Sequence, residues 1–251
     1  MIKFNEKNYA KLCDDRVNNP SKIQKILKQR KKRSKLTKDG KLFIVAADHT
    51  ARGIISASGN SMAMADRYDL LERLIRSLEV PGVDGILATP DIVEELAYFG
   101  AIHNKVVFGS INRAGILGMD WEMDDRESSY DVKGITEFGL DGGKTLLRIE
   151  KSDPGVVNTI EMVAKVNSQL ARAKKVSIIE PLPYVKNAAG KFELNIDVTE
   201  LARVIGIASA LGTTSAYTWL KVPAFEDFAY AAKATTLPLM LLQLDLVLAA
   251  R

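Results

Sequence analysis

The chain has 251 residues, 47% of them apolar and 26% charged, and a formal net charge of +4. This is a soluble globular composition with material for a large core, and the length is ordinary for one α/β barrel. The single cysteine, Cys13, excludes an internal disulfide framework and a cysteine metal cluster. No apolar run reaches the roughly 18 residues of a membrane span, and no apolar signal region opens the chain, so we expect a cytoplasmic protein without membrane contact.

The positive charge is concentrated near the N-terminus. Residues 21–41 hold ten Lys and Arg and one Asp. Such a run could be a nucleic-acid patch. However, Ile23, Ile26 and Leu27 recur at helical spacing and no aromatic residue is interleaved, which favours a solvated face of a basic amphipathic helix over 21–35. We therefore expect a helical extension at 1–40 that does not bind nucleic acid, followed by one domain at 41–251.

From residue 42 onwards, short apolar runs alternate with amphipathic helical patterns. Continuous apolar runs are typical of strands that are buried on both faces of a parallel sheet. A connection of about twenty residues, 112–130, is long enough to suggest a functional loop. The predicted strands are 42–47, 84–89, 105–110, 143–149, 175–181, 217–223 and 237–242, and the predicted helices are 66–80, 92–99 (capped by Asp91), 131–140, 153–173, 197–210 (capped by Asp197) and 225–234.

Seven strands that alternate with helices predict a parallel α/β fold. No Gly-x-Gly-x-x-Gly turn follows a strand, which disfavours a dinucleotide-binding sheet and favours a (β/α)8 TIM barrel. The residues after 242 are too few for an eighth unit. Three explanations stay open: an incomplete barrel, a truncated chain, or an N-terminal segment that fills the gap.

Lys221 is the first candidate for chemistry. It lies at the carboxyl end of the sixth strand, on the same face as Trp219 and Tyr217, because strand side chains alternate. Desolvation on an inward face lowers the pKa of a lysine and frees its amine to attack a carbonyl. Lys144, by contrast, begins its strand, so we expect it at the opposite face of the barrel.

Other polar residues are predicted at the same barrel mouth. They are Asp48, Ser110, Arg148 and Glu180, at the ends of four further strands. An amine, two carboxylates and a guanidinium suit carbonyl chemistry, in which the lysine forms an imine, a carboxylate moves protons and the arginine holds an anion. Their alternative role is a structural network of ion pairs.

Arg52 follows the first strand. It is either a second contact for an anionic substrate or a solvated loop residue, and Trp219 is a further substrate contact. Neither His-Glu-x-x-His nor Gly-x-Ser-x-Gly occurs, so we expect no metal, no cofactor and no serine nucleophile.

Three segments in this order resemble class I, Schiff-base barrel aldolases of the archaeal-type fructose-bisphosphate and tagatose-bisphosphate kinds. They are Ala-Ala-Asp-His-Thr-Ala-Arg-Gly at 46–53, Ile-Glu-Pro-Leu-Pro-Tyr at 179–184 and Leu-Lys-Val-Pro at 220–223. Asn-Arg-Ala-Gly at 112–115 and Glu-Met-Asp-Asp-Arg at 122–126 place the chain nearest to an uncharacterised deoxyribose-phosphate aldolase-like branch. The resemblance implies a metal-independent lyase with Lys221 as the imine-forming residue.

The chain departs from this family in two places. Leu182 stands where the archaeal-type enzymes carry a proton-transferring tyrosine, so Glu180 or Tyr184 would have to replace it. The seventh strand ends without the Gly-Gly turn of the family's phosphate cradle.

The leading hypothesis is an aldolase that acts on a small sugar phosphate or a related polyol-derived compound, in a homo-oligomer. A transaldolase-like or isomerase-like reaction through the same imine is a second hypothesis. A catalytically inactive barrel that serves as a binding or oligomerisation module is a third.

Overall fold

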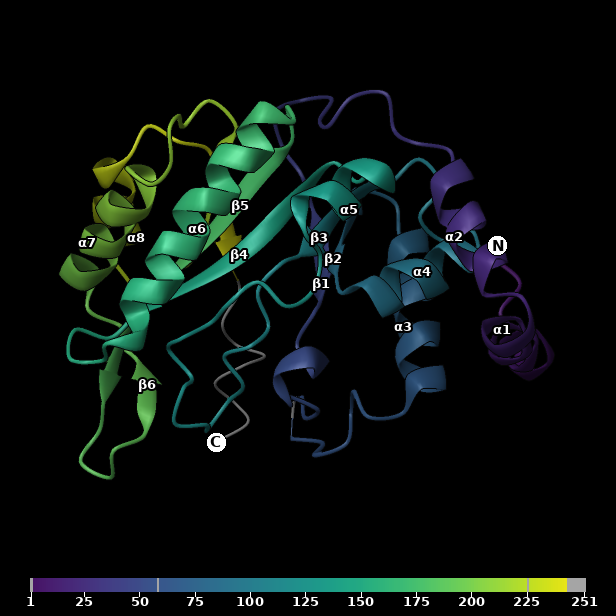
Figure 1. Ribbon diagram of the computed structural model, residues 1–251, viewed down its shortest axis with the longest axis horizontal. Helices are drawn as coiled ribbons and strands as arrows, with labels where there is room; N and C mark the ends of the chain where they lie inside the picture. The colour runs from purple at the N-terminus through teal and green to yellow at the C-terminus, as the bar shows by residue number, and fades with distance from the viewer. Residues whose placement is uncertain (1, 58, 225, 243–251) are drawn as a thin grey trace.

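A computed structural model describes residues 2–57, 59–224 and 226–242 (Figure 1). Seven parallel strands lie side by side in chain order, and the short strand β6 (Phe192–Leu194) pairs antiparallel with β5. All seven predicted strands are confirmed, whereas the hairpin between β5 and β6 was not predicted. The parallel strands are β1 (Ile44–Ala47), β2 (Gly85–Ala88), β3 (Val106–Ser110), β4 (Gly142–Ile149), β5 (Val176–Lys186), β7 (Thr218–Pro223) and β8 (Leu239–Leu242).

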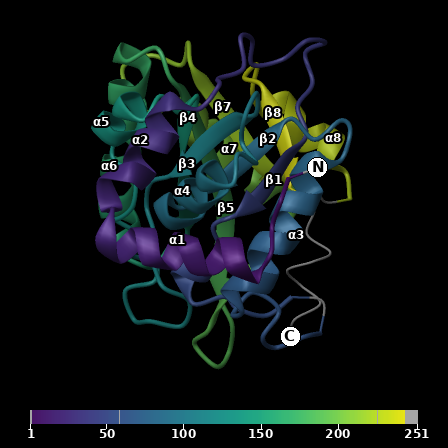
Figure 2. The ribbon, with the colours of Figure 1, turned by 90° about the vertical axis from the view of Figure 1, so that its right-hand side faces the viewer.

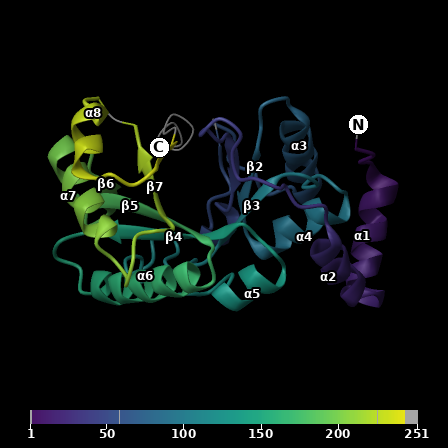
Figure 3. The ribbon, with the colours of Figure 1, turned by 90° about the horizontal axis from the view of Figure 1, so that it is seen from above.

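The sheet is curled, and helices cover its outer face (Figure 3). Among the described residues, β1 and β8 are the two edges and do not pair with each other. The architecture is thus a curled half-barrel with the strand and helix alternation of an incomplete (β/α)8 barrel, as the sequence predicted. The helices are α3 (Arg67–Glu79), α4 (Pro90–Tyr98), α5 (Val132–Glu137), α6 (Gly155–Arg172), α7 (Val198–Ser209) and α8 (Phe228–Ala231), with 3-10 turns η1 (Thr50–Arg52) and η2 (Ala232–Ala234). None of the described helices is long and apolar enough to cross a bilayer.

Local capping chemistry sets several helix starts. The Asp66 carboxylate accepts the Asp69 N–H at α3, and Asp197 accepts two backbone N–H groups at α7. The prediction that Asp91 caps α4 was wrong. Pro90 occupies the first turn there, because its fixed φ suits that position, and Thr89 is the N-cap. Phe225, where the last helix was predicted to begin, lies outside the described residues.

The N-terminal segment forms two helices, α1 (Glu6–Asn18) and α2 (Pro20–Gln29), where the sequence predicted one over 21–35. Figure 2 shows both beside α4. The Arg30 side chain is buried and donates to the carbonyls of Phe138 and Gly139 at 2.8 and 2.9 Å. Part of the basic run is therefore committed to the barrel, while the domain division at residue 40 stays a prediction.

The barrel interior has an apolar floor. One core cluster consists of strand residues without any helix residue, so it lies on the concave side of the sheet; its buried members are Leu87, Val106, Phe108, Val176 and Ile178. Trp219 packs edge-on against Phe108, with 6.1 Å between ring centroids. Because Trp219 precedes Lys221 by two residues on β7, this floor lies below Lys221.

Candidate active site

Charged side chains from three strands, and one that directly follows a fourth strand, meet above the apolar floor. Lys221 of β7 donates from Nζ to Glu180 Oε1 of β5 at 2.7 Å, and Lys144 of β4 pairs with the other oxygen of Glu180. Lys144 Nζ also lies 3.7 Å from Asp48 Oδ2, directly after β1. None of the four is more than 8% exposed. The structure thus brings together Asp48, Glu180 and Lys221, and their catalytic roles stay a prediction.

The expectation that Lys144 lies at the opposite face was wrong. Lys144 is the third residue of β4, but its register partner on β3 is Ser110, the last residue of that strand. Neighbouring barrel strands are staggered, so a position early in one strand can stand level with the end of the next. The sequence did hold one signal: Lys144 shares its strand face with Leu146 and Arg148.

Asp48 is held by residues of β3 and the connection after it. Ser110 Oγ donates to Asp48 Oδ2 at 2.7 Å, and the Arg113 guanidinium pairs with the same carboxylate. Arg113 Nε also donates to Ser110 Oγ at 2.7 Å. Arg113 was not among the predicted site residues, because nothing local shows that a loop arginine folds back onto the first strand.

Burial and charge oppose each other in this cluster. Burial raises the pKa of Glu180, but Lys144 and Lys221 outweigh it and bring the pKa down to about 2. Burial likewise opposes ionisation of Asp48, yet Lys144 and Arg113 hold its pKa well below the usual range. For Lys144, burial exceeds the attraction of both carboxylates and lowers its pKa to about 8. Near neutral pH the two carboxylates are therefore charged, and Lys144 is within reach of losing its proton.

His49 lies next to the cluster. Burial lowers the pKa of its imidazole, with Asp48 acting in the opposite direction. The ring is therefore neutral at pH 7 and adds no charge to the group.

The two predicted arginine contacts hold the long connection. Arg52 pairs with Asp125 and donates to the carbonyls of Asn112 and Gly115 at 2.8 and 2.7 Å. Arg148 pairs with Glu122 and also donates to the Gly115 carbonyl, at 2.9 Å. Both arginines are buried, and their predicted contact with substrate stays a prediction.

The remaining predicted residues are placed as follows. Trp219 stands in the apolar floor, and Ser110 contacts Asp48 directly. Tyr184 lies over Arg148, with the guanidinium carbon 5.9 Å from the ring centroid, and burial raises the pKa of its phenol. The end of the seventh strand, 243–245, where the phosphate cradle departs from the family, lies outside the described residues.

A buried amine beside a carboxylate can attack a carbonyl and exchange protons as the imine forms. Within the described residues, no three His, Cys, Asp or Glu side chains are grouped as metal ligands. The expectation that the protein uses no metal and no cofactor stays a prediction.

The solved structures similar to this chain share its fold. Cgl0159 from Corynebacterium glutamicum is 40% identical, with a TM-score of 0.93 over 97% of this chain and 82% of that chain. A Schiff-base-forming fructose-1,6-bisphosphate aldolase is 18% identical, with a TM-score of 0.57 over 87% of this chain and 79% of its own. An archaeal fructose-1,6-bisphosphate aldolase whose catalytic lysine carries a carbinolamine is 16% identical, with a TM-score of 0.58 over the same shares.

At 16–18% identity, the two aldolases show a common fold and confirm the predicted barrel architecture. No functionally curated protein matches the sequence significantly. The Cgl0159-like family model matches residues 40–247, more than half of the chain. Together with the 40% identity to Cgl0159, this match shows that the chain belongs to the Cgl0159-like family.

Proposed function

We propose that this protein is a class I aldolase-like lyase that forms or cleaves a carbon–carbon bond in a small sugar phosphate through a Schiff base on Lys221. The observation that carries the proposal is the 2.7 Å contact of Lys221 Nζ with Glu180 in a buried cluster that also holds Asp48. The fold shared with Schiff-base aldolases supports it.

The reaction begins when Lys221 passes a proton to Glu180 and its freed amine attacks the substrate carbonyl. Glu180 gives a proton to the hydroxyl group of the carbinolamine. That hydroxyl leaves as water, and a protonated imine forms. A base then removes the proton of the β-hydroxyl, the bond between the α and β carbons breaks, and its electron pair moves into the imine to form an enamine. Protonation of the enamine and hydrolysis release the second product and restore the amine.

The residues around Lys221 have separate tasks in this scheme. Glu180 lies between the two amines and, because its pKa is about 2, it carries a proton only in transit from Lys221 to the carbinolamine. Asp48 stays ionised and favours the positive charge of the protonated imine. Lys221 is assigned the covalent role because it lies at the carboxyl end of its strand and is 8% exposed, against 2% for Lys144.

Borohydride trapping tests the proposal. The protein is incubated with a panel of ketose and aldose phosphates, reduced, digested and examined by mass spectrometry. We expect an adduct on the peptide that contains Lys221, no adduct in Lys221→Met, and an unchanged adduct in Lys151→Met, which removes a surface lysine. The absence of any adduct across the panel would exclude the imine, and an adduct on Lys144 would reassign the covalent role.

Product analysis separates the related reactions. Aldol cleavage gives two smaller carbonyl products, transaldolase chemistry requires an acceptor aldehyde, and an isomerase keeps the carbon skeleton intact.

The competing proposal is an inactive barrel that serves as an oligomerisation module. Exposed apolar side chains in the long connection favour it, since Leu117, Met119 and Trp121 are 55, 42 and 53% exposed. Size-exclusion chromatography with light scattering tests the homo-oligomer. An oligomer without a borohydride adduct would favour this second proposal.

A further inference from the structure

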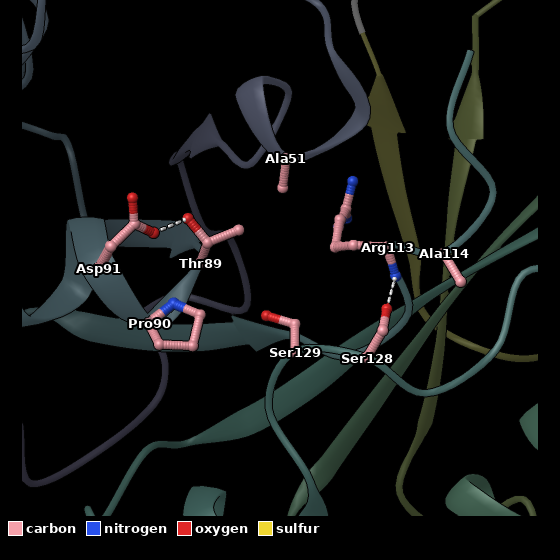
Figure 4. Close-up of a pocket in the computed structure, with 8 residues that line it drawn as sticks. All are labelled: Ala51, Thr89, Pro90, Asp91, Arg113, Ala114, Ser128 and Ser129. Carbon is pink, nitrogen blue, oxygen red and sulfur yellow. Dashed lines mark hydrogen bonds between the residues drawn. The ribbon is translucent and has the colours of Figure 1, made fainter. Parts of the chain in front are cut away.

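A cavity of about 510 Å³ lies beside the charged cluster, on its Asp48 side. Residues that follow three successive strands form its wall: Ala51 after β1, Thr89 after β2 and Arg113 after β3. Ser128 and Ser129, at the end of the long connection, complete this wall (Figure 4). The volume is in the range of small-ligand sites.

The cavity adjoins the cluster through one residue. Arg113 lines the cavity and also pairs with Asp48, which lies 3.7 Å from Lys144. Lys144 in turn shares Glu180 with Lys221. This chain of contacts links the cavity to Lys221 through Asp48 and Glu180.

The lining offers hydroxyl groups and no uncommitted cation. Arg113 is occupied, because its guanidinium contacts Ser110 Oγ, the Asp48 carbonyl and the Asp48 carboxylate. Among the described residues of the lining, the other charged side chain is Asp91, which accepts from Thr89 Oγ1 at 2.5 Å and from Arg67 at 2.6 Å, so Arg67 is committed as well. A phosphate here would meet a carboxylate and would have no free positive partner, which makes its desolvation costly.

Neutral hydroxyl groups fit the same lining. The Ser129 hydroxyl points into the space between Pro90 and Arg113 (Figure 4). Ser128 Oγ accepts the Arg113 backbone N–H at 2.8 Å, so its own proton is free to be donated. The apolar walls at Ala51 and Pro90 suit the carbon side of a polyhydroxy chain.

We propose that this cavity is a subsite for the neutral, hydroxylated end of the substrate, and that it discriminates against a phosphate at that end. The inference rests on the proposed function for its account of which part of the substrate enters. The binding of a neutral polyol to the cavity can be measured without any imine.

The first measurement is the direct binding of erythritol and of erythritol 4-phosphate to the whole protein. Ligand-observed NMR detects the binding. We expect erythritol to bind about tenfold more tightly than its phosphate. Ser129→Ala should weaken erythritol binding by about threefold to tenfold, the effect of one lost hydrogen bond. Thr89→Val gives a second, independent loss of a hydroxyl, and Ser77→Ala, on α3 away from the cavity, is the matched control.

The second measurement is borohydride trapping with fructose 1-phosphate and fructose 1,6-bisphosphate, which share the reacting end and differ only in the far phosphate. We expect the monophosphate to be trapped at least about tenfold more efficiently, with Ser129→Ala narrowing the difference. Equal or better trapping of the bisphosphate overturns the subsite and leaves the Schiff base standing. Erythritol binding that depends on Ser129, without an adduct from any sugar of the panel of ketose and aldose phosphates, supports the subsite and overturns the proposed function. Polyol binding that neither variant changes overturns the subsite.

Discussion

Glu180→Gln tests the charged cluster most directly. The substitution keeps the size of the side chain but removes the anion that Lys144 and Lys221 share. Two buried ammonium groups then face each other with only Asp48 as a nearby counter-ion. Removing one partner of a buried ion pair costs about 3–5 kcal/mol of unfolding free energy.

The pKa of Glu180 gives a separate figure for the same effect. A fall from 4.5 to about 2 corresponds to about 3 kcal/mol of stability. Because the folded pKa is the lower one, this contribution is fully present above pH 4.5 and is lost as the pH falls towards 2. The difference between the wild-type protein and Glu180→Gln should therefore be largest near pH 7 and shrink below pH 4.5.

Urea unfolding followed by circular dichroism at pH 7 and at pH 3.5 measures this difference. Glu137→Gln is the matched control, since it breaks a pair with Lys28 in which both side chains are more than 40% exposed, and we expect little change. A Glu180→Gln protein that is as stable as the control, or a stability loss that stays the same at pH 3.5, would refute the reasoning. In the trapping assay, the loss of a proton carrier should slow adduct formation by about 10²-fold or more.

Three further outcomes are expected from the same network. Burial holds the pKa of Lys144 at about 8 in the folded protein, so the unfolded chain binds more protons than the folded chain between pH 8 and 10.5. The unfolding free energy should therefore rise across that window by about 3 kcal/mol. Urea titrations of Lys144→Met should lack this rise. Gly115→Ala should lower the free energy of thermal unfolding by about 1–3 kcal/mol, because the added methyl group would meet Arg148 and the loop backbone. Gly206→Ala is the control: a methyl group there has no atom within 4 Å, and the better helix former should raise the unfolding free energy by up to about 1 kcal/mol. Asp125→Asn should cost about 3–5 kcal/mol and speed hydrogen exchange in residues 112–126, and unchanged exchange there would mean that this buried pair does not hold the connection.

The order of strands and helices could be predicted because its signals are local. Continuous apolar runs marked the parallel strands, and an amphipathic pattern marked the predicted helix at 66–80, which is α3. The N-cap at Asp197 was also readable from sequence. The hairpin to β6 gave no such signal, because its strand has only three residues.

The site could be predicted only in part. Alternation along each strand, together with the rule that barrel sites lie at the carboxyl ends, brought Asp48, Glu180 and Lys221 into one group. The same reasoning misplaced Lys144, since a position within one strand does not give its height in the barrel. It also could not show that Arg52 and Arg148 are occupied by the long connection.

The alternation of strands and helices, the inward faces of the strands and the types of side chain at their ends follow from local patterns, because periodicity and capping act over a few residues. Which of these side chains share a partner depends on how the strands and loops pack together. The stagger of β4 against β3 brings Lys144 to Glu180, and the path of the long connection brings Arg113 to Asp48. Both depend on contacts between residues more than thirty positions apart, for which the chain carries no local signal.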